Sequence, residues 1–126
     1  MKYFYFIATV LIACNNPKND EFKDILPKDL IGKTIEYTYG ESIYHVILDT
    51  DSTMHWEAVA GDEKGAREKE TYFMESVGHN KIFISWDEAN GTGVSQILDF
   101  NEGKVYNHLL QDRKLQNGHG TIRILE

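Results

Sequence analysis

From Lys33 onward the chain is built of short runs rich in β-branched and aromatic residues, separated by turn residues at spacings of about 8–12. This pattern is typical of an all-β sandwich or barrel. Turns such as Gly40–Ser42 and Asn101–Gly103 predict hairpins, so we expect each strand to be antiparallel to the one before it. The predicted strands are Lys33–Tyr39, Ile43–Leu48, Thr53–Val59, Glu70–Glu75, Lys81–Asp87, Val94–Phe100, Lys104–Leu110 and Thr121–Leu125.

Eight short strands in so few residues suit a small closed barrel, which leaves no free edges and encloses side chains or one small ligand. A sandwich of two sheets is the alternative, because alternation alone does not exclude it. Two connections are longer than a hairpin needs, Ala60–Lys69 and Gln111–Gly120, and we expect both to be solvated loops. We expect Asp24–Gly32 to form a short helical turn that packs onto one end of the sheet.

The first residues have the character of a targeting segment. An apolar run after Met1-Lys2 stops at Cys14, the only cysteine of the chain. It is too short to span a bilayer comfortably but suits the apolar part of a secretory signal. The residues Leu11–Cys14 resemble a bacterial lipobox, in which the cysteine is diacylated and becomes the mature N-terminus. An N-terminal anchor helix and a buried strand with an incidental cysteine are the alternatives.

This interpretation divides the chain into a signal peptide (1–13), a polar tether (14–23) and one β-barrel domain (24–126). The protein would then be anchored by its acyl chains in the bacterial cell envelope, facing the periplasm or the surface. The mature chain would have no thiol, and therefore no disulfide and no cysteine nucleophile.

The charge of the chain argues against some classes of partner. Removing residues 1–13 takes Lys2 from 13 basic residues and nothing from 20 acidic residues, which leaves 12 against 20 and a formal charge of −8. Such a surface disfavours nucleic-acid backbones and anionic lipid. The five histidines show no spacing typical of a compact metal site, and we expect neither metal nor cofactor.

The segment Ile82–Phe100 carries the first candidate for chemistry. Period-2 alternation places Ile82, Ile84 and Trp86 on one strand face, and Glu88 falls on the same face if the strand continues. A carboxyl group held against an indole and partly desolvated has a raised pKa, as a general acid near neutral pH requires. The alternative is a solvated glutamate at a strand end.

Two tyrosines form the second candidate. Tyr37 and Tyr39 share a face of their strand, where two phenols could hold a carboxylate or a carbonyl, although alternate tyrosines are also common packing. Trp56 is expected to line the same interior. Arg67, in the first long connection, is the guanidinium best placed to reach over the mouth of a barrel.

Two segments carry a family resemblance. IGKTIEYTYGESIYHVIL (Ile31–Leu48) is similar to the N-terminal strands of bacterial phenolic acid decarboxylases, which contain a YTY-type motif. FISWDEANGTGVSQILDF (Phe83–Phe100) resembles the SW-x-E-x-x-G-T-x-V-S segment of that family. It is equally similar to MoaF-like domains, small calycin (lipocalin-like) barrels named after a molybdenum-cofactor-associated protein. The short length and the GTIRIL ending favour the MoaF-like group.

The resemblance implies roles for individual residues. In the decarboxylases the two tyrosines hold the substrate carboxylate, which implies this role for Tyr37 and Tyr39, and the glutamate matched by Glu88 takes part in acid/base chemistry. The family arginine follows G-M-V-A-G-R, whereas this chain has AVAGDEKGAR, so Arg67 matches only if the loop is shifted.

Three functions follow as hypotheses. The first is a lipid-anchored MoaF-like barrel that binds a small apolar or aromatic ligand through Tyr37, Tyr39, Trp56, Trp86 and Glu88, and it requires only a cavity. The second is a cofactor-free decarboxylase of hydroxycinnamate-like acids, which also requires a cation at the cavity. The third is a structural or interaction lipoprotein, which predicts a filled interior and an exposed apolar patch.

Overall fold

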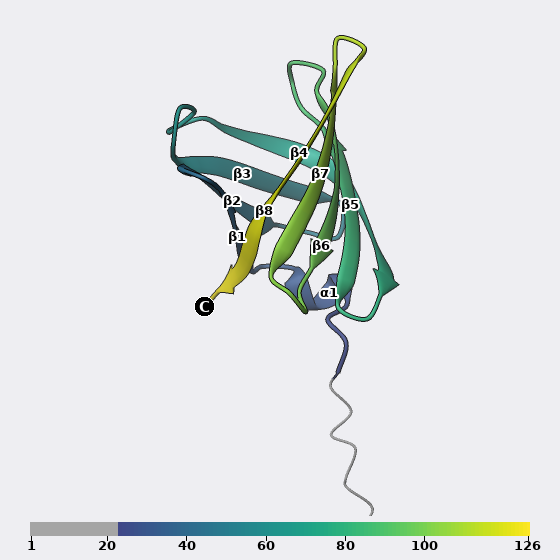
Figure 1. The fold of residues 1–126 in the computed structure, drawn as a ribbon. Helices are drawn as coiled ribbons and strands as arrows, with labels where there is room; N and C mark the ends of the chain where they lie inside the picture. The colour runs from purple at the N-terminus through teal and green to yellow at the C-terminus, as the bar shows by residue number, and fades with distance from the viewer. Residues whose placement is uncertain (1–22) are drawn as a thin grey trace, which may run out of the picture.

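The computed structural model describes residues 23–126, and in them the chain closes into one eight-stranded antiparallel β-barrel (Figure 1). Each strand pairs with the next in sequence, and β1 also pairs with β8, so the predicted barrel is confirmed and the two-sheet sandwich is wrong. The elements are α1 (Pro27–Leu30), β1 (Thr34–Tyr39), β2 (Ser42–Leu48), β3 (Thr53–Ala60), β4 (Arg67–Gly78), β5 (Lys81–Asp87), β6 (Gly93–Asp99), β7 (Lys104–Gln111) and β8 (Lys114–Leu125).

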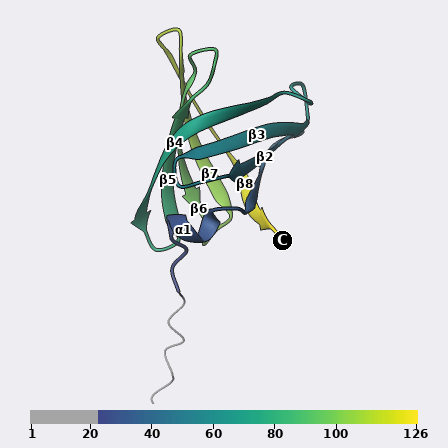
Figure 2. The same ribbon diagram turned by 180° about the vertical axis from the view of Figure 1, so that it is seen from behind.

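Alternation along each strand sends apolar side chains inward, and they fill the half of the barrel next to α1. Leu30 of α1 is fully buried together with Ile35, Leu48, Ile82 and Leu98, which come from strand ends on that side. A parallel bridge between Ile31 and Leu48 attaches the end of α1 to β2. Figures 1 and 2 show α1 lying beneath this end of the barrel. The short helical turn and the packed core therefore close one end, and the opposite end is left for a cavity.

One of the two long connections expected from the sequence is instead a strand hairpin. Gln111–Gly120, predicted as a solvated loop, continues β7 into β8, with Gln111 paired to Lys114. Asp112 and Arg113 form the turn with φ of 50° and 64°, the left-handed conformation that two-residue hairpins favour. This hairpin extends beyond the barrel (Figure 1), and its side chains are exposed on both faces, so the sequence lacks the apolar alternation that marks a half-buried strand.

The other long connection is shorter than expected. β4 begins at Arg67, so the loop covers 61–66 and the prediction of a loop as far as Lys69 is wrong for its last three residues. The β-rich pattern is weak there because glutamates occupy the inner positions of the strand, as described below.

The structure does not describe residues 1–22, so the predicted signal peptide (1–13), the predicted lipidation of Cys14 and nearly all of the predicted tether (14–23) lie outside the described residues. Within residues 23–126, no helix is both long and apolar enough to cross a membrane.

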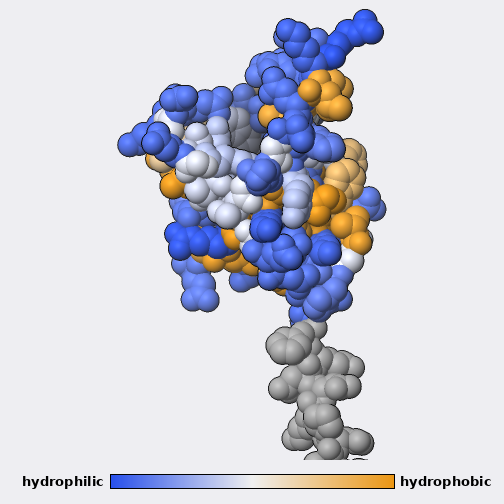
Figure 3. Space-filling view, viewed as in Figure 1, coloured by the Kyte–Doolittle hydropathy of each residue, from blue (hydrophilic) through white to orange (hydrophobic). Residues whose placement is uncertain are grey.

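The outer surface is mainly hydrophilic but carries exposed apolar side chains (Figure 3). Phe73 on β4 is 80% exposed, and Leu115 on β8 is 71% exposed. Phe83, Ile97 and Tyr106 are cross-strand neighbours on the outer face of β5, β6 and β7. One side of the barrel thus presents apolar groups to solvent.

Candidate functional site

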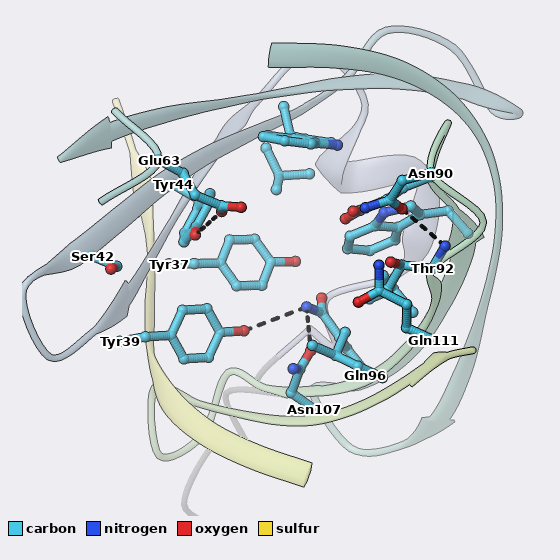
Figure 4. A pocket seen from close by; sticks show the side chains of 16 residues that line it. Tyr37, Tyr39, Ser42, Tyr44, Glu63, Asn90, Thr92, Gln96, Asn107 and Gln111 are labelled. Atoms are coloured by element: carbon cyan, nitrogen blue, oxygen red, sulfur yellow. Dashed lines mark hydrogen bonds between the residues drawn. The ribbon is translucent and has the colours of Figure 1, made fainter. Parts of the chain in front are cut away.

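A cavity of about 370 Å³ occupies the half of the barrel away from α1 (Figure 4). Its lining comes from β1, β2, β3, β5, β6, β7 and the two loops at that end. The lining residues are Tyr37, Tyr39, Ser42, Tyr44, Val46, Trp56, Glu63, Trp86, Glu88, Asn90, Thr92, Val94, Gln96, Asn107, Leu109 and Gln111. This volume lies within the range of small-molecule sites.

One wall of the cavity is a continuous row of aromatic rings. Tyr37 and Tyr39 stack with their centroids 6.4 Å apart, Tyr39 and Tyr44 meet edge to face at 6.2 Å, and Tyr44 meets Trp56 at 6.1 Å. The row forms because inner positions of adjacent strands come into register, as in the Tyr37–Tyr44 pair. Such a wall offers apolar contact together with the negative faces of the rings.

Facing this wall is a polar pair, buried Gln96 on β6 and half-buried Asn107 on β7. The Gln96 amide nitrogen donates to Asn107 Oδ1 at 2.8 Å and more weakly to Tyr39 Oη at 3.4 Å (Figure 4). Its own oxygen, Oε1, is buried without a hydrogen-bond partner among the described residues. A polar residue at an inner strand position between Val94 and Leu98 is the sequence signal that could have identified Gln96.

The hydroxyl of Tyr37, which is only 1% exposed, also lacks a partner in the described part of the chain. The buried indole N–H groups of Trp56 and Trp86 lie next to the Glu70 and Glu88 carboxyl groups, and each indole acts to lower the pKa of its neighbouring carboxyl. Burial raises the pKa of both Tyr37 and Tyr39, so both phenols stay neutral. Buried polar groups are normally satisfied, so the unpartnered Tyr37 hydroxyl and Gln96 Oε1 at one cavity mark a place for a ligand or ordered water.

Glu88 lies on the cavity rim, two residues after Trp86. A tight turn holds it, since its N–H donates to the Thr92 carbonyl at 2.8 Å and its carbonyl accepts from the Gly91 N–H at 2.8 Å. Partial burial raises the pKa of Glu88, the negative charges of Glu68 and Glu63 raise it further, and the Trp86 indole opposes the rise.

Glu63 is a site residue that the sequence did not indicate. It comes from loop 61–66, and its Oε2 accepts a hydrogen bond of 2.5 Å from the Tyr44 hydroxyl. Burial and then Glu63 raise the pKa of Tyr44 to about 12. Gly61, with φ of 96°, allows the loop to approach, because a Cβ there would lie 2.5 Å from Ser42 Oγ. This tertiary contact explains why the loop sequence alone did not place Glu63.

Two more carboxylates stand beside the cavity on the inner face of β4. Glu68 and Glu70 alternate with buried Tyr72, and Glu68 Oε2 accepts from the backbone N–H of Ala89 at 3.3 Å. Partial burial, followed by the neighbouring Glu68, raises the pKa of Glu70 to about 7. The carboxylates of β4 and of the rim therefore repel one another.

Arg67 lies apart from the cavity. It is exposed at the start of β4. Side chains alternate between the two faces of the strand, and Glu68 and Tyr72 take the inner face, so Arg67 lies on the outer face. Its cross-strand neighbour is Glu57. The cavity lining contains no lysine, arginine or histidine among the residues described. Within 23–126, no group of three or more His, Cys, Asp or Glu side chains is arranged to hold a metal ion.

The structure thus brings together Tyr37, Tyr39, Trp56, Trp86 and Glu88 around one cavity and leaves out Arg67. Among the lining residues that sequence reasoning did not select, Tyr44, Glu63, Gln96 and Asn107 carry the hydrogen bonds described above. Tyr44 had a usable signal, because it shares the inner face of its strand with Val46.

Comparisons with known proteins agree with this fold. The family model described as MoaF-like matches residues 31–123. A crystal structure from Burkholderia vietnamiensis, given the provisional name beta-lactamase, aligns with a TM-score of 0.70 and 24% identity over 76% of this chain and 95% of that one. At this identity the likeness shows the fold alone. Comparison with curated proteins gives no match.

Proposed function

Because the chain belongs to the MoaF-like family, we propose that it is a β-barrel binding protein for a small aromatic or apolar ligand. The observation that carries this proposal is an aromatic-walled cavity on which two buried polar atoms, Tyr37 Oη and Gln96 Oε1, have no hydrogen-bond partner among residues 23–126. Such a cavity combines apolar walls with a few polar groups that orient a ligand.

The alternative of a structural or interaction lipoprotein is less well supported. The exposed apolar side chains such as Phe73 are present, but that hypothesis also requires a filled interior, and this barrel has a cavity of about 370 Å³. Leaving buried hydroxyl and amide groups without partners costs roughly 1–3 kcal/mol each. A ligand that supplies the missing hydrogen bonds explains why such groups are kept.

Intrinsic fluorescence of the purified full chain tests the proposal directly. The chain has two tryptophans, Trp56 and Trp86, and both line the cavity. We expect saturable quenching by small aromatic probes. The cavity-filling change Val94→Phe should weaken this binding at least tenfold, whereas Ile97→Phe, on the outer face of the same strand, should not. Absence of saturable quenching by neutral, cationic and anionic aromatic probes alike would refute the proposal.

One observation favours a second candidate, cofactor-free decarboxylation of phenolic acids. Glu88, with its raised pKa, shares the cavity with Tyr37 and Tyr39. In this reaction the bond to the carboxylate carbon breaks, carbon dioxide leaves, and a proton replaces it on the vinyl carbon. The exposed Arg67 does not supply the cation that would hold the substrate carboxylate.

The test is the loss of the ultraviolet band of p-coumarate or ferulate with time. A steady loss that Glu88→Gln abolishes would establish the decarboxylase, and an unchanged band with both substrates would exclude it for them.

We further propose that Cys14 is acylated and anchors the barrel in the bacterial cell envelope. The support is the lipobox-like sequence Leu11–Cys14 at the only cysteine. Mass spectrometry of the protein from a bacterial membrane fraction should show a chain that begins at Cys14 and carries acyl groups. A chain that retains residues 1–13 would contradict this.

A further inference from the structure

The charged side chains that line the cavity are all acidic. Glu63 and Glu88 are the two acidic side chains of the lining, and no basic residue accompanies them in the described lining. None of the ion pairs formed within residues 23–126 involves Glu63, Glu68 or Glu88. Within the described residues, therefore, no basic side chain lies within ion-pair distance of these carboxyl groups to offset their negative charge when they are ionised.

These carboxylates are close enough to influence the same groups. Tyr44 donates to Glu63 at 2.5 Å, and its pKa is raised by both Glu63 and Glu88. Glu88 in turn has its pKa raised by Glu68 and Glu63. A positive charge placed at the rim would interact favourably with all three carboxylates, and a second negative charge would be repelled by them.

The walls add a second, independent feature that suits a cation. Four rings, those of Tyr37, Tyr39, Tyr44 and Trp56, form the continuous wall described above, and Trp86 lies on the cavity as well. Aromatic rings present a negative face, and several rings around one space are the usual environment for an ammonium group.

The buried polar groups complete the arrangement. Gln96 Oε1 is an acceptor without a partner among residues 23–126, and Gln96 is only 6% exposed. Tyr37, 1% exposed, directs into the cavity a hydroxyl that also lacks a partner in this part of the chain (Figure 4). These oxygens offer hydrogen-bond acceptors to an N–H or O–H group of the ligand, and Tyr37 also has a donor.

From these observations we infer that the ligand of the barrel is an organic cation, an ammonium group on a small aromatic or apolar body. This inference rests on the proposed binding function and narrows its ligand class. The aromatic wall contacts the apolar body, and the rim carboxylates with the ring faces hold the charge. The same features disfavour anionic ligands, which include the phenolic acids of the decarboxylase hypothesis.

Three probes that share a phenol ring and differ in charge test the inference. They are tyramine (cation), 4-ethylphenol (neutral) and 4-hydroxyphenylacetate (anion), each titrated into the full chain at pH 8 with tryptophan fluorescence as the readout. We expect tyramine to bind at least about tenfold more tightly than 4-ethylphenol, and the anion to bind most weakly. Raising the salt concentration should weaken tyramine more than 4-ethylphenol.

Two variants assign the preference to the carboxylates. Glu88→Gln and Glu63→Gln should each reduce tyramine affinity severalfold while leaving 4-ethylphenol affinity within about twofold. Glu63 lies on an exposed loop, so its variant tests the idea even if Glu88→Gln folds poorly. Glu57→Gln, on the outer face of β3, is the matched control and should change neither affinity.

The outcomes separate this inference from the function on which it rests. Binding of 4-ethylphenol as tightly as tyramine, or a preference for the anion, would overturn the cation inference and leave the binding function standing. Loss of the tyramine preference in Glu57→Gln but not in the rim variants would also overturn it. If none of the three probes gives saturable quenching, both the binding function and the inference fail.

Discussion

Replacing Glu70 by glutamine should stabilise the protein at neutral and alkaline pH but not in acid. Partial burial and the neighbouring Glu68 raise the pKa of Glu70 from 4.5 to about 7. The folded state therefore binds its proton more tightly than the unfolded chain does. The resulting penalty on stability is absent below about pH 4.5, grows between pH 4.5 and 7, and is constant above pH 7. Glutamine, which is never charged, removes it.

The size of the effect follows from the same two values. A pKa raised from 4.5 to about 7 corresponds to an upper limit of about 3 kcal/mol. The Glu70 side chain keeps partial contact with water, which screens the repulsion, so we expect about 1 kcal/mol. A gain of this size raises the melting temperature of a domain of this length by about 4 °C.

Thermal unfolding of the wild-type and Glu70→Gln proteins at pH 4 and pH 8 measures this difference. Glu75→Gln is the control, because Glu75 is an exposed residue on the outer face of the same strand, and it should change the melting temperature little at either pH. Equal melting temperatures for wild type and Glu70→Gln at pH 8, or a stabilisation that is larger at pH 4, would show that the repulsion between the two carboxylates has been misjudged.

Two further predictions concern the backbone. Gly120→Ala should destabilise the barrel by about 1–3 kcal/mol in urea unfolding, because the new Cβ would lie 2.4 Å from the Thr38 carbonyl oxygen, whereas Gly118→Ala meets nothing within 4 Å and should cost less than half as much. Equal costs would contradict the packing argument. Arg113→Gly should raise stability by about 0.5–1 kcal/mol in the same assay, because Arg113 has φ of 64°, and Asp112→Gly should gain less, because aspartate tolerates this conformation better. If Arg113→Gly instead lowers stability, the contacts of the arginine side chain stabilise the hairpin by more than the strained backbone conformation of Arg113 costs.

Alternation of apolar residues predicted the barrel because most strands have one buried face. The same rule correctly predicted that Tyr37, Trp56 and Trp86 lie in one interior. Residues two apart in a strand share a face, and this holds even where the ends of the strand are predicted inexactly. It failed where no face is buried, as in the β7–β8 hairpin, whose residues 111–119 are all exposed. A strand that is exposed to water on both faces has no alternation of apolar and polar residues, so this pattern cannot identify it.

The placement of Arg67 shows a different limit. A strand that begins three residues earlier than expected turns a loop residue into a strand residue, and strand parity then decides which face it takes. Arg67 lies at an outward-facing position of β4, whereas Glu68 lies at an inward-facing position. Glu63 depends on how loop 61–66 packs against Ser42, a contact between segments that no local pattern encodes.

The pairing of β1 with β8 has a consequence for how the barrel assembles. Seven of the eight strand pairings in residues 23–126 join sequence neighbours, while the closing pair joins residues distant in the sequence, such as Glu36 and Arg123, which are 87 positions apart. Local hairpins form quickly, and closing a long loop is slow, so the seam between β1 and β8 should be the last part to form. Thr34 and Leu125 face each other across this seam. A linker from the end of β8 to the residues before α1, with a new chain start at the exposed Asp112 turn, would keep α1 and give a circular permutant with the same fold and a different order of assembly.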